Sequence, residues 1–147
     1  MGARVTPEQR CDEKGNKRTD LNVRFRRKLW TLDFVVVHPL APSRLDVASK
    51  SPLSSAAKAE NDKIRKHEQS ADHIGATFVP FAVESTCGIG ARAAAFITEI
   101  LKVARDVRNV WVPKDVVKQI WRTITCEIVR GNADILRSAK QKNLRAF

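Results

Sequence analysis

Apolar and polar side chains alternate over residues 20–25. One face of this segment carries Leu21, Val23 and Phe25, and the other carries Asp20, Asn22 and Arg24. A strand with one buried face needs this period of two. Residues 29–37 follow as a nearly continuous apolar run, which is typical of a strand covered on both faces. A charged segment, residues 26–28, separates the two strands, so the pattern predicts a β-hairpin.

Proline and glycine mark the boundaries of the next elements. Pro39 and Pro42 end the second strand, because proline donates no backbone hydrogen bond and restricts the residue before it. A loop is expected up to Ser51, where a Ser-Pro pair starts a helix that reaches Ile74 and is closed by Gly75. The apolar stripe of this helix is thin, so much of it is expected to face solvent or a ligand.

A third strand is predicted at residues 78–83, where Pro80 indicates an edge strand or a bulge. Glu84 lies at the end of this strand, before a Gly-Ile-Gly turn at 88–90. Because sites often lie at sheet ends, Glu84 is a candidate metal ligand. A structural cap explains the same position equally simply.

Two helices are predicted in the last third of the chain. Apolar residues at helical spacing indicate one helix over 91–107, which is expected to cover the sheet, and a second after Pro113 that stops at Gly131. One face of the second helix is basic and could contact phosphates: Lys114, Lys118 and Arg122. An ordinary solvated face explains the same stripe.

These elements predict an α/β fold with a small mixed sheet, built on the β-hairpin and flanked by helices. Residues 1–19 are polar and are expected to form an arm. Residues 20–109 are expected to form the core, and residues 110–147 a basic helical extension packed on it. No internal repeat is visible.

The chain has 147 residues with 27 Lys and Arg against 16 Asp and Glu, a net charge of +11. Such an excess suggests a polyanionic partner, nucleic acid first, although a solvated surface also produces it. The three cysteines, Cys11, Cys87 and Cys126, are widely spaced, which argues against a disulfide framework and a Cys-rich zinc site. No run is long enough for a membrane span, so an intracellular protein without a membrane partner or small-molecule cofactor is expected.

The hairpin brings two carboxylates to one place. A two-residue turn pairs Phe25 with Lys28 and, in the same register, Asp20 with Asp33. Opposed like charges are destabilising unless a cation lies between them. Oxygen ligands favour Mg²⁺ or Mn²⁺, which binds phosphate and activates water. Alternatively, Asp20 caps the strand and Asp33 pairs with a nearby Lys or Arg.

Several short motifs follow one another along the chain: Lys-Arg-Thr-Asp at 17–20, Leu-Asp-Phe-Val-Val-Val at 32–37, Leu-Ala-Pro-Ser at 40–43, Ala-Glu at 59–60, Lys-Ile-Arg-Lys at 63–66, Phe-Val-Pro-Phe-Ala-Val-Glu at 78–84 and Arg-Gly-Asn-Ala at 130–133. In this order they resemble the PD-(D/E)xK restriction-endonuclease-like region that follows the reverse transcriptase of some eukaryotic non-LTR-like retroelements. The similarity covers most of the chain.

The resemblance implies a metal-dependent endonuclease domain that hydrolyses a phosphodiester in target DNA, with Asp20 and Asp33 holding Mg²⁺ or Mn²⁺. Two positions depart from the pattern, because Val35 occupies the usual lysine slot and Thr19 replaces a proline. It also implies that the first core helix and strand would precede this chain.

Related nucleases can take the lysine from a neighbouring helix, which here would be Lys66 or, as the second choice, Lys63. Solvated helix charges would look the same. The expected partner is DNA, with RNA also open, in the nucleus, and phosphate contacts are expected from the turn: Arg26, Arg27 and Lys28. Two alternatives are a basic nucleic-acid-binding remnant without catalysis and a poorly folding fragment.

Overall fold

The computed structural model describes residues 3–10, 18–108 and 113–144. In chain order, the described elements are β1 (Arg4–Arg10), β2 (Arg18–Phe25), β3 (Lys28–Val37), α1 (Leu45–Ala48), α2 (Ser54–His73), β4 (Thr77–Glu84), α3 (Ala91–Arg108) and α4 (Lys114–Leu144). Two compact units are formed, Met1–Thr98 and Glu99–Phe147, with the boundary inside α3. Across these described ranges, no helix combines the length and apolarity that a membrane span requires.

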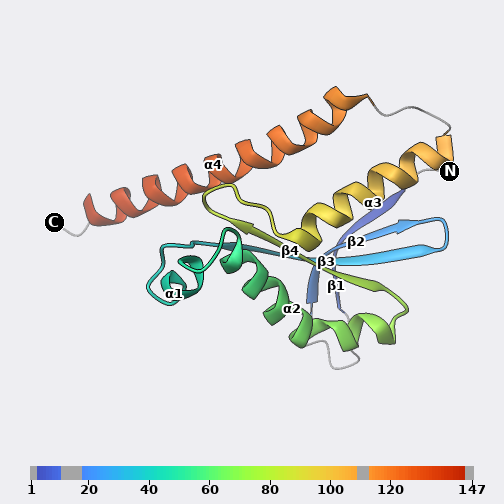
Figure 1. The fold of residues 1–147 in the computed structure, drawn as a ribbon, viewed down its shortest axis with the longest axis horizontal. Coiled ribbons are helices and arrows are strands. Elements are labelled where there is room, and N and C mark those ends of the chain that lie inside the picture. Colours follow the sequence, from blue (N-terminus) through green and yellow to red (C-terminus); the bar gives the residue numbers. More distant parts are fainter. Residues whose placement is uncertain (1–2, 11–17, 109–112, 145–147) are drawn as a thin grey trace. The chain divides into compact units, whose positions relative to one another are not determined.

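One mixed sheet joins the strands in the order β1-β2-β3-β4 (Figure 1). β2 runs antiparallel to both β1 and β3, whereas β3 and β4 are parallel. A parallel pair needs a long crossover connection, and α2 lies in that connection. The predicted α/β class, with a mixed sheet, flanking helices and a C-terminal helix, is therefore confirmed.

The two faces of β3 are covered by different helices. On one face, Val37 packs in an apolar cluster with three alanines: Ala56 and Ala59 of α2 and Ala82 of β4. On the opposite face, Trp30 is 2% exposed and meets Phe96 of α3 edge to face, with ring centroids 6.0 Å apart. Burial of a large apolar side chain stabilises a fold by roughly 1.5–3 kcal/mol, so these contacts fix the sheet between α2 and the start of α3.

Three local predictions are confirmed. The hairpin has a two-residue turn, with Arg26 in the left-handed region at φ 52°. Gly75, at φ 64°, follows α2 where a glycine was predicted to close the helix. Pro80 lies in β4, which is the last strand in the order of the described sheet.

The first strand corrects the prediction for residues 1–19. Residues 4–10 form β1, which pairs antiparallel with β2 from Arg4↔Arg24 to Arg10↔Arg18. Its side chains are mostly polar, and Val5 is 53% exposed, so no apolar alternation signals the strand. β1 is held in the sheet by backbone hydrogen bonds to β2, and a pattern of side chains does not reveal such bonds.

Three further predictions need correction. β3 is not covered on both faces along its length, because Phe34 and Val36 are 43% and 59% exposed beyond the region that Phe96 contacts. The loop before α2 contains the short helix α1. The last helix does not stop at Gly131 but continues to Leu144, and ion pairs at i,i+3 spacing flank the glycine on both sides.

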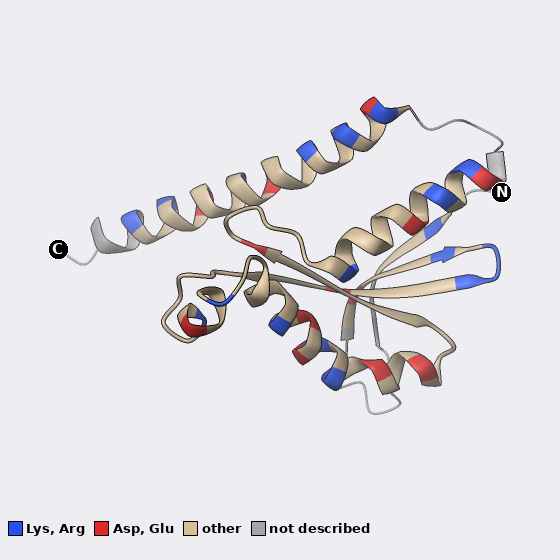
Figure 2. Cartoon of the chain, viewed as in Figure 1, with Lys and Arg blue, Asp and Glu red and all other residues tan. Residues whose placement is uncertain are grey.

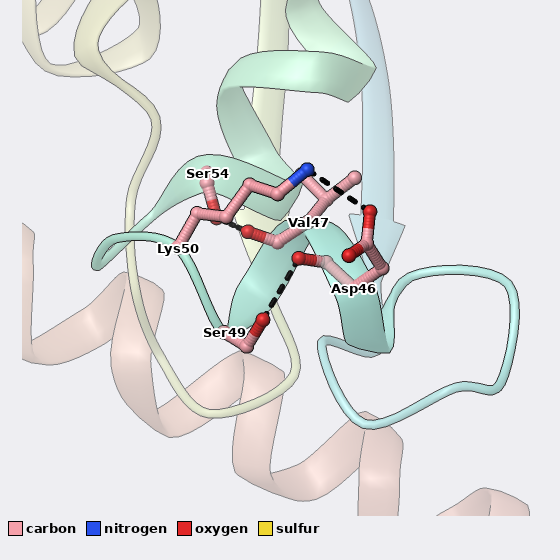
Figure 3. A network of polar contacts seen from close by, with 5 residues as sticks. All are labelled: Asp46, Val47, Ser49, Lys50 and Ser54. Atoms are coloured by element: carbon pink, nitrogen blue, oxygen red, sulfur yellow. Dashed lines mark hydrogen bonds and ion pairs between the residues drawn. The ribbon is translucent and has the colours of Figure 1, made fainter.

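Polar contacts tie α1 to the start of α2 (Figure 3). The Ser54 hydroxyl donates to the carbonyl of Val47, and the Ser49 hydroxyl donates to the carbonyl of Asp46. Lys50 forms an ion pair with Asp46 at 3.0 Å. This connection sets the position at which α2 begins its path across the sheet.

Candidate functional site

The hairpin register matches the prediction around the two aspartates. The ladder between β2 and β3 runs from Phe25↔Lys28 to Leu21↔Leu32, so one further step would oppose Asp20 and Asp33. At that step, the Oδ2 atom of Asp20 instead accepts a hydrogen bond from the backbone N–H of Phe34, at 2.6 Å. The Asp20 carboxylate therefore lies beside the backbone that directly follows Asp33.

Asp33 is buried, with 5% of its surface exposed, and it faces α2. The Nζ atom of Lys63 lies 2.7 Å from its Oδ2 atom, and the Nε2 atom of His67 lies 3.4 Å from the same oxygen. These two residues are one helical turn apart, so they share a face of α2. The Lys63 contact is a close ion pair to a carboxylate that is buried beneath α2.

Lys63, rather than Lys66, is the helix lysine that reaches the second aspartate. Lys66 is exposed, and within the described ranges no carboxylate lies within ion-pairing distance of it. Val35, in the slot usual for lysine, is packed against the Val37–alanine cluster on the same sheet face as Asp33. An ammonium group at position 35 would be pressed into apolar contacts, whereas Lys63 approaches Asp33 from the helix.

Thr19 and Asp20 differ sharply in exposure. Thr19, which stands where the resemblance expects proline, is 1% exposed, and its hydroxyl accepts a hydrogen bond from Thr31 at 2.6 Å. Asp20 is exposed. Thr19 therefore anchors the start of β2, and the neighbouring carboxylate is open to a partner.

Glu84 and Glu60 cap helix N-termini. The Oε1 atom of Glu84 accepts from the Ala56 amide in the first turn of α2, at 3.3 Å, so Glu84 has the geometry of the cap alternative. Glu60 accepts from the amides of Arg92 and Ala93 at the start of α3, at 3.0 and 3.3 Å. Burial raises the pKa of the Glu60 carboxyl, against the opposing effect of these hydrogen bonds and the Arg92 charge.

Sequence patterns missed both Glu60 and His67. Glu60 lies in a motif, but its partners are 32 and 33 residues away, and no local signal connects a helix interior to a later helix start. His67 follows Lys63 by four residues, and this spacing alone could have placed the two side chains together. Its ring also stacks on Phe78 of β4, with centroids 5.7 Å apart.

The predicted basic residues lie in two separate places (Figure 2). Arg26, Arg27 and Lys28 are exposed at the hairpin turn, and the Lys28 ammonium lies 5.6 Å from the centre of the Trp30 ring. The others are exposed on α4, in the second compact unit: Lys114, Lys118 and Arg122. Lys118 lies 3.8 Å from Asp115, so its charge is partly balanced within the helix.

The donor atoms decide which metal could bind. Throughout the described part, no group of three His, Cys, Asp or Glu side chains could hold a metal ion. Magnesium, however, binds through one or two carboxylates and takes its other ligands from water and phosphate. Asp20 and Asp33 lie on adjacent strands, and Asp20 accepts a hydrogen bond from the backbone amide that directly follows Asp33. Two carboxylates are the number that magnesium takes from a protein in such sites.

An open groove of about 970 Å³ lies elsewhere in the first unit, along α2. Its lining includes Lys58, Arg65 and Arg92 and contains neither aspartate of the hairpin. This groove is therefore separate from the aspartates of the hairpin.

No protein-family model matches this chain, and no curated protein matches it in sequence.

Proposed function

We propose that this chain is a metal-dependent DNA endonuclease domain of retroelement origin, restriction-endonuclease-like in fold. The observation that carries the proposal is the contact of Lys63 with Asp33, at 2.7 Å. It joins the second acid of a β-hairpin to a helix lysine, which the motif resemblance implies for the site. The same ion pair is also the geometry of the alternative in which Asp33 pairs with a nearby Lys or Arg. Asp20 lies exposed beside the same strand.

The roles follow from burial and charge. Asp20 and Asp33 would hold Mg²⁺, which when bound supplies a Lewis acid and lowers the pKa of a water molecule. The ammonium group of Lys63, at 2.7 Å from Asp33, would stabilise negative charge that develops on a phosphate bound at this metal. His67 also contacts Asp33, at 3.4 Å. A DNA substrate would place this activity in the nucleus.

A plasmid-nicking assay with Mg²⁺ or Mn²⁺ tests the proposal. We expect Asp20→Ala to abolish nicking without unfolding the protein, because Asp20 is exposed. Asp46→Ala is the matched control, since Asp46 is an exposed aspartate on α1. Equal nicking by wild type and Asp20→Ala would reject the proposal and indicate a contaminating nuclease. A wild-type protein that leaves the plasmid intact would also reject the proposal.

A second candidate function is nucleic-acid binding without cleavage. It is favoured by Val35 in the usual lysine slot. This alternative predicts salt-sensitive DNA binding by wild type and Asp20→Ala alike, with no Mg²⁺-dependent product.

A further inference from the structure

Arg4 and Arg24 oppose each other directly across β1 and β2. Opposed side chains share a sheet face with Cβ atoms roughly 4.5–5.5 Å apart, and like charges there are destabilising. Both are exposed, and neither has a carboxylate within ion-pairing distance among the residues that the structure describes. Charges on an edge strand also oppose association with other chains, and a bound anion would offset the repulsion between the two guanidinium groups.

The arginine pair continues into the hairpin turn. Arg26 and Arg27 directly follow the end of β2, and both are exposed (Figure 2). Lys28, also exposed, begins the next strand. We name this set the basic sheet end: Arg4, Arg24, Arg26, Arg27 and Lys28. Arg4 and Arg24 lie on one face of the sheet and Lys28, over the Trp30 ring, on the other, so the five cations surround the end of the sheet. Such a group suits a row of phosphates better than a single small anion.

We infer that the basic sheet end binds the phosphate backbone of duplex DNA, beside the site at which cleavage is proposed; the inference rests on that proposed function. Arg24 and Asp20 share a face of β2, because they are an even number of residues apart. Four residues of strand span about 13 Å at roughly 3.3 Å per residue. Successive phosphates of one strand advance about 3.4 Å along the duplex axis, so a duplex that lies along β2 would meet the arginines within a few base pairs of the cleaved bond.

The test measures binding of a short fluorescein-labelled DNA duplex by the full chain over a series of salt concentrations. Arg4→Gln with Arg24→Gln removes two phosphate contacts, so the slope of log K against log salt should become shallower by about 1.8. The matched control is Lys102→Gln with Arg105→Gln, which removes two exposed cations from α3 and should leave the slope unchanged. The arginine variant should melt no lower than wild type, because an opposed like-charge pair is gone.

An unchanged slope in the arginine variant overturns the inference, and so does an equal loss in the control variant. Equal wild-type affinity for anionic phospholipid vesicles would overturn it as well, since the surface would then respond to negative charge alone. If no protein nicks DNA but the arginine variant still loses salt-dependent binding, the inference stands and the endonuclease proposal fails. If Asp20→Ala stops nicking while the arginine variant binds like wild type, the endonuclease proposal stands and the inference about the basic sheet end fails.

Discussion

Lys63 and His67 both approach the Oδ2 atom of Asp33, a residue that is only 5% exposed. A buried carboxylate without a partner is strongly unfavourable, so the helix residues stabilise Asp33 whatever the protein does. The same ammonium is also the group that a phosphate would attract. A structural and a catalytic role for Lys63 are therefore separable only by measuring stability and cleavage in the same variants.

Lys63→Met should lower the free energy of unfolding by about 3 kcal/mol, because it leaves a buried carboxylate without its ammonium partner. Lys66→Met, on the same helix but exposed, should change it by less than about 0.5 kcal/mol. Urea unfolding followed by circular dichroism measures both. Equal losses in the two variants would show that the Asp33 contact contributes little.

Glu60→Gln tests the buried cap of α3 through pH. The folded-state pKa of Glu60 is raised above 4.5. Between 4.5 and this raised pKa, the folded protein therefore holds a proton on Glu60 that the unfolded chain has released. The Glu60 contribution to stability should therefore decrease as pH rises from about 4.5 through the raised pKa, then level off. The glutamine side chain of the variant cannot titrate, so the variant should gain stability relative to wild type across that window. Urea midpoints between about pH 4 and 8 measure this, with exposed Glu68→Gln as the control; a constant difference would contradict it.

At the scale of elements, the sequence predicted the helices and strands whose pattern of apolar side chains reflects which face is buried. Alternation at 20–25 and the apolar run after it predicted the hairpin, and its two-residue turn predicted the register. A Ser-Pro start and a closing glycine predicted α2, and helical spacing predicted α3. β1 was missed because an exposed edge strand is held by backbone hydrogen bonds. The Lys63 contact with Asp33 depends on how α2 crosses the sheet, which spacing does not determine, so Lys66 remained the first choice. Gly131 suggested a helix end because glycine has a low helix propensity, but ion pairs on both sides of it support the helix.

Two glycines near helix α3 and within helix α4 have opposite surroundings. A Cβ atom at Gly90 would collide with the Glu60 carboxylate and lie 3.1 Å from the carbonyl of Ala82, so Gly90→Ala should destabilise the protein by about 1–3 kcal/mol.

Gly131 has open space around it inside α4. Gly131→Ala should stabilise that helix by about 0.5–1 kcal/mol, because alanine is the better helix former. Thermal melts compare the two variants, and a stabilising Gly90→Ala would show that α3 starts elsewhere.

For the whole molecule, positive charge is spread over both compact units. Met1–Thr98 has 16 basic and 11 acidic residues, a net +5, and Glu99–Phe147 has 11 basic and 5 acidic residues, a net +6. A net positive charge of this size destabilises a folded chain through self-repulsion, and it also attracts polyanions. Along α4, pairs such as Arg130–Glu127 and Arg137–Asp134 balance part of the charge locally. Arg4 and Arg24 have no such ion pair among the described residues, and they oppose each other directly, so a bound phosphate would offset their repulsion.

Duplex DNA should consequently stabilise the folded chain. A duplex at about 100 times its dissociation constant adds about 2.7 kcal/mol to the free energy of unfolding, provided that it binds the folded state alone. For a chain of this size, that corresponds to a rise in melting temperature of roughly 5–10 °C. Differential scanning fluorimetry at low salt measures the shift. Asp20→Ala should show at least the wild-type shift and the Arg4→Gln, Arg24→Gln variant a smaller one. Near 1 M NaCl the screening length falls to about 3 Å, so the shift should disappear; a shift that survives such salt would mean that apolar contacts, rather than phosphates, hold the duplex.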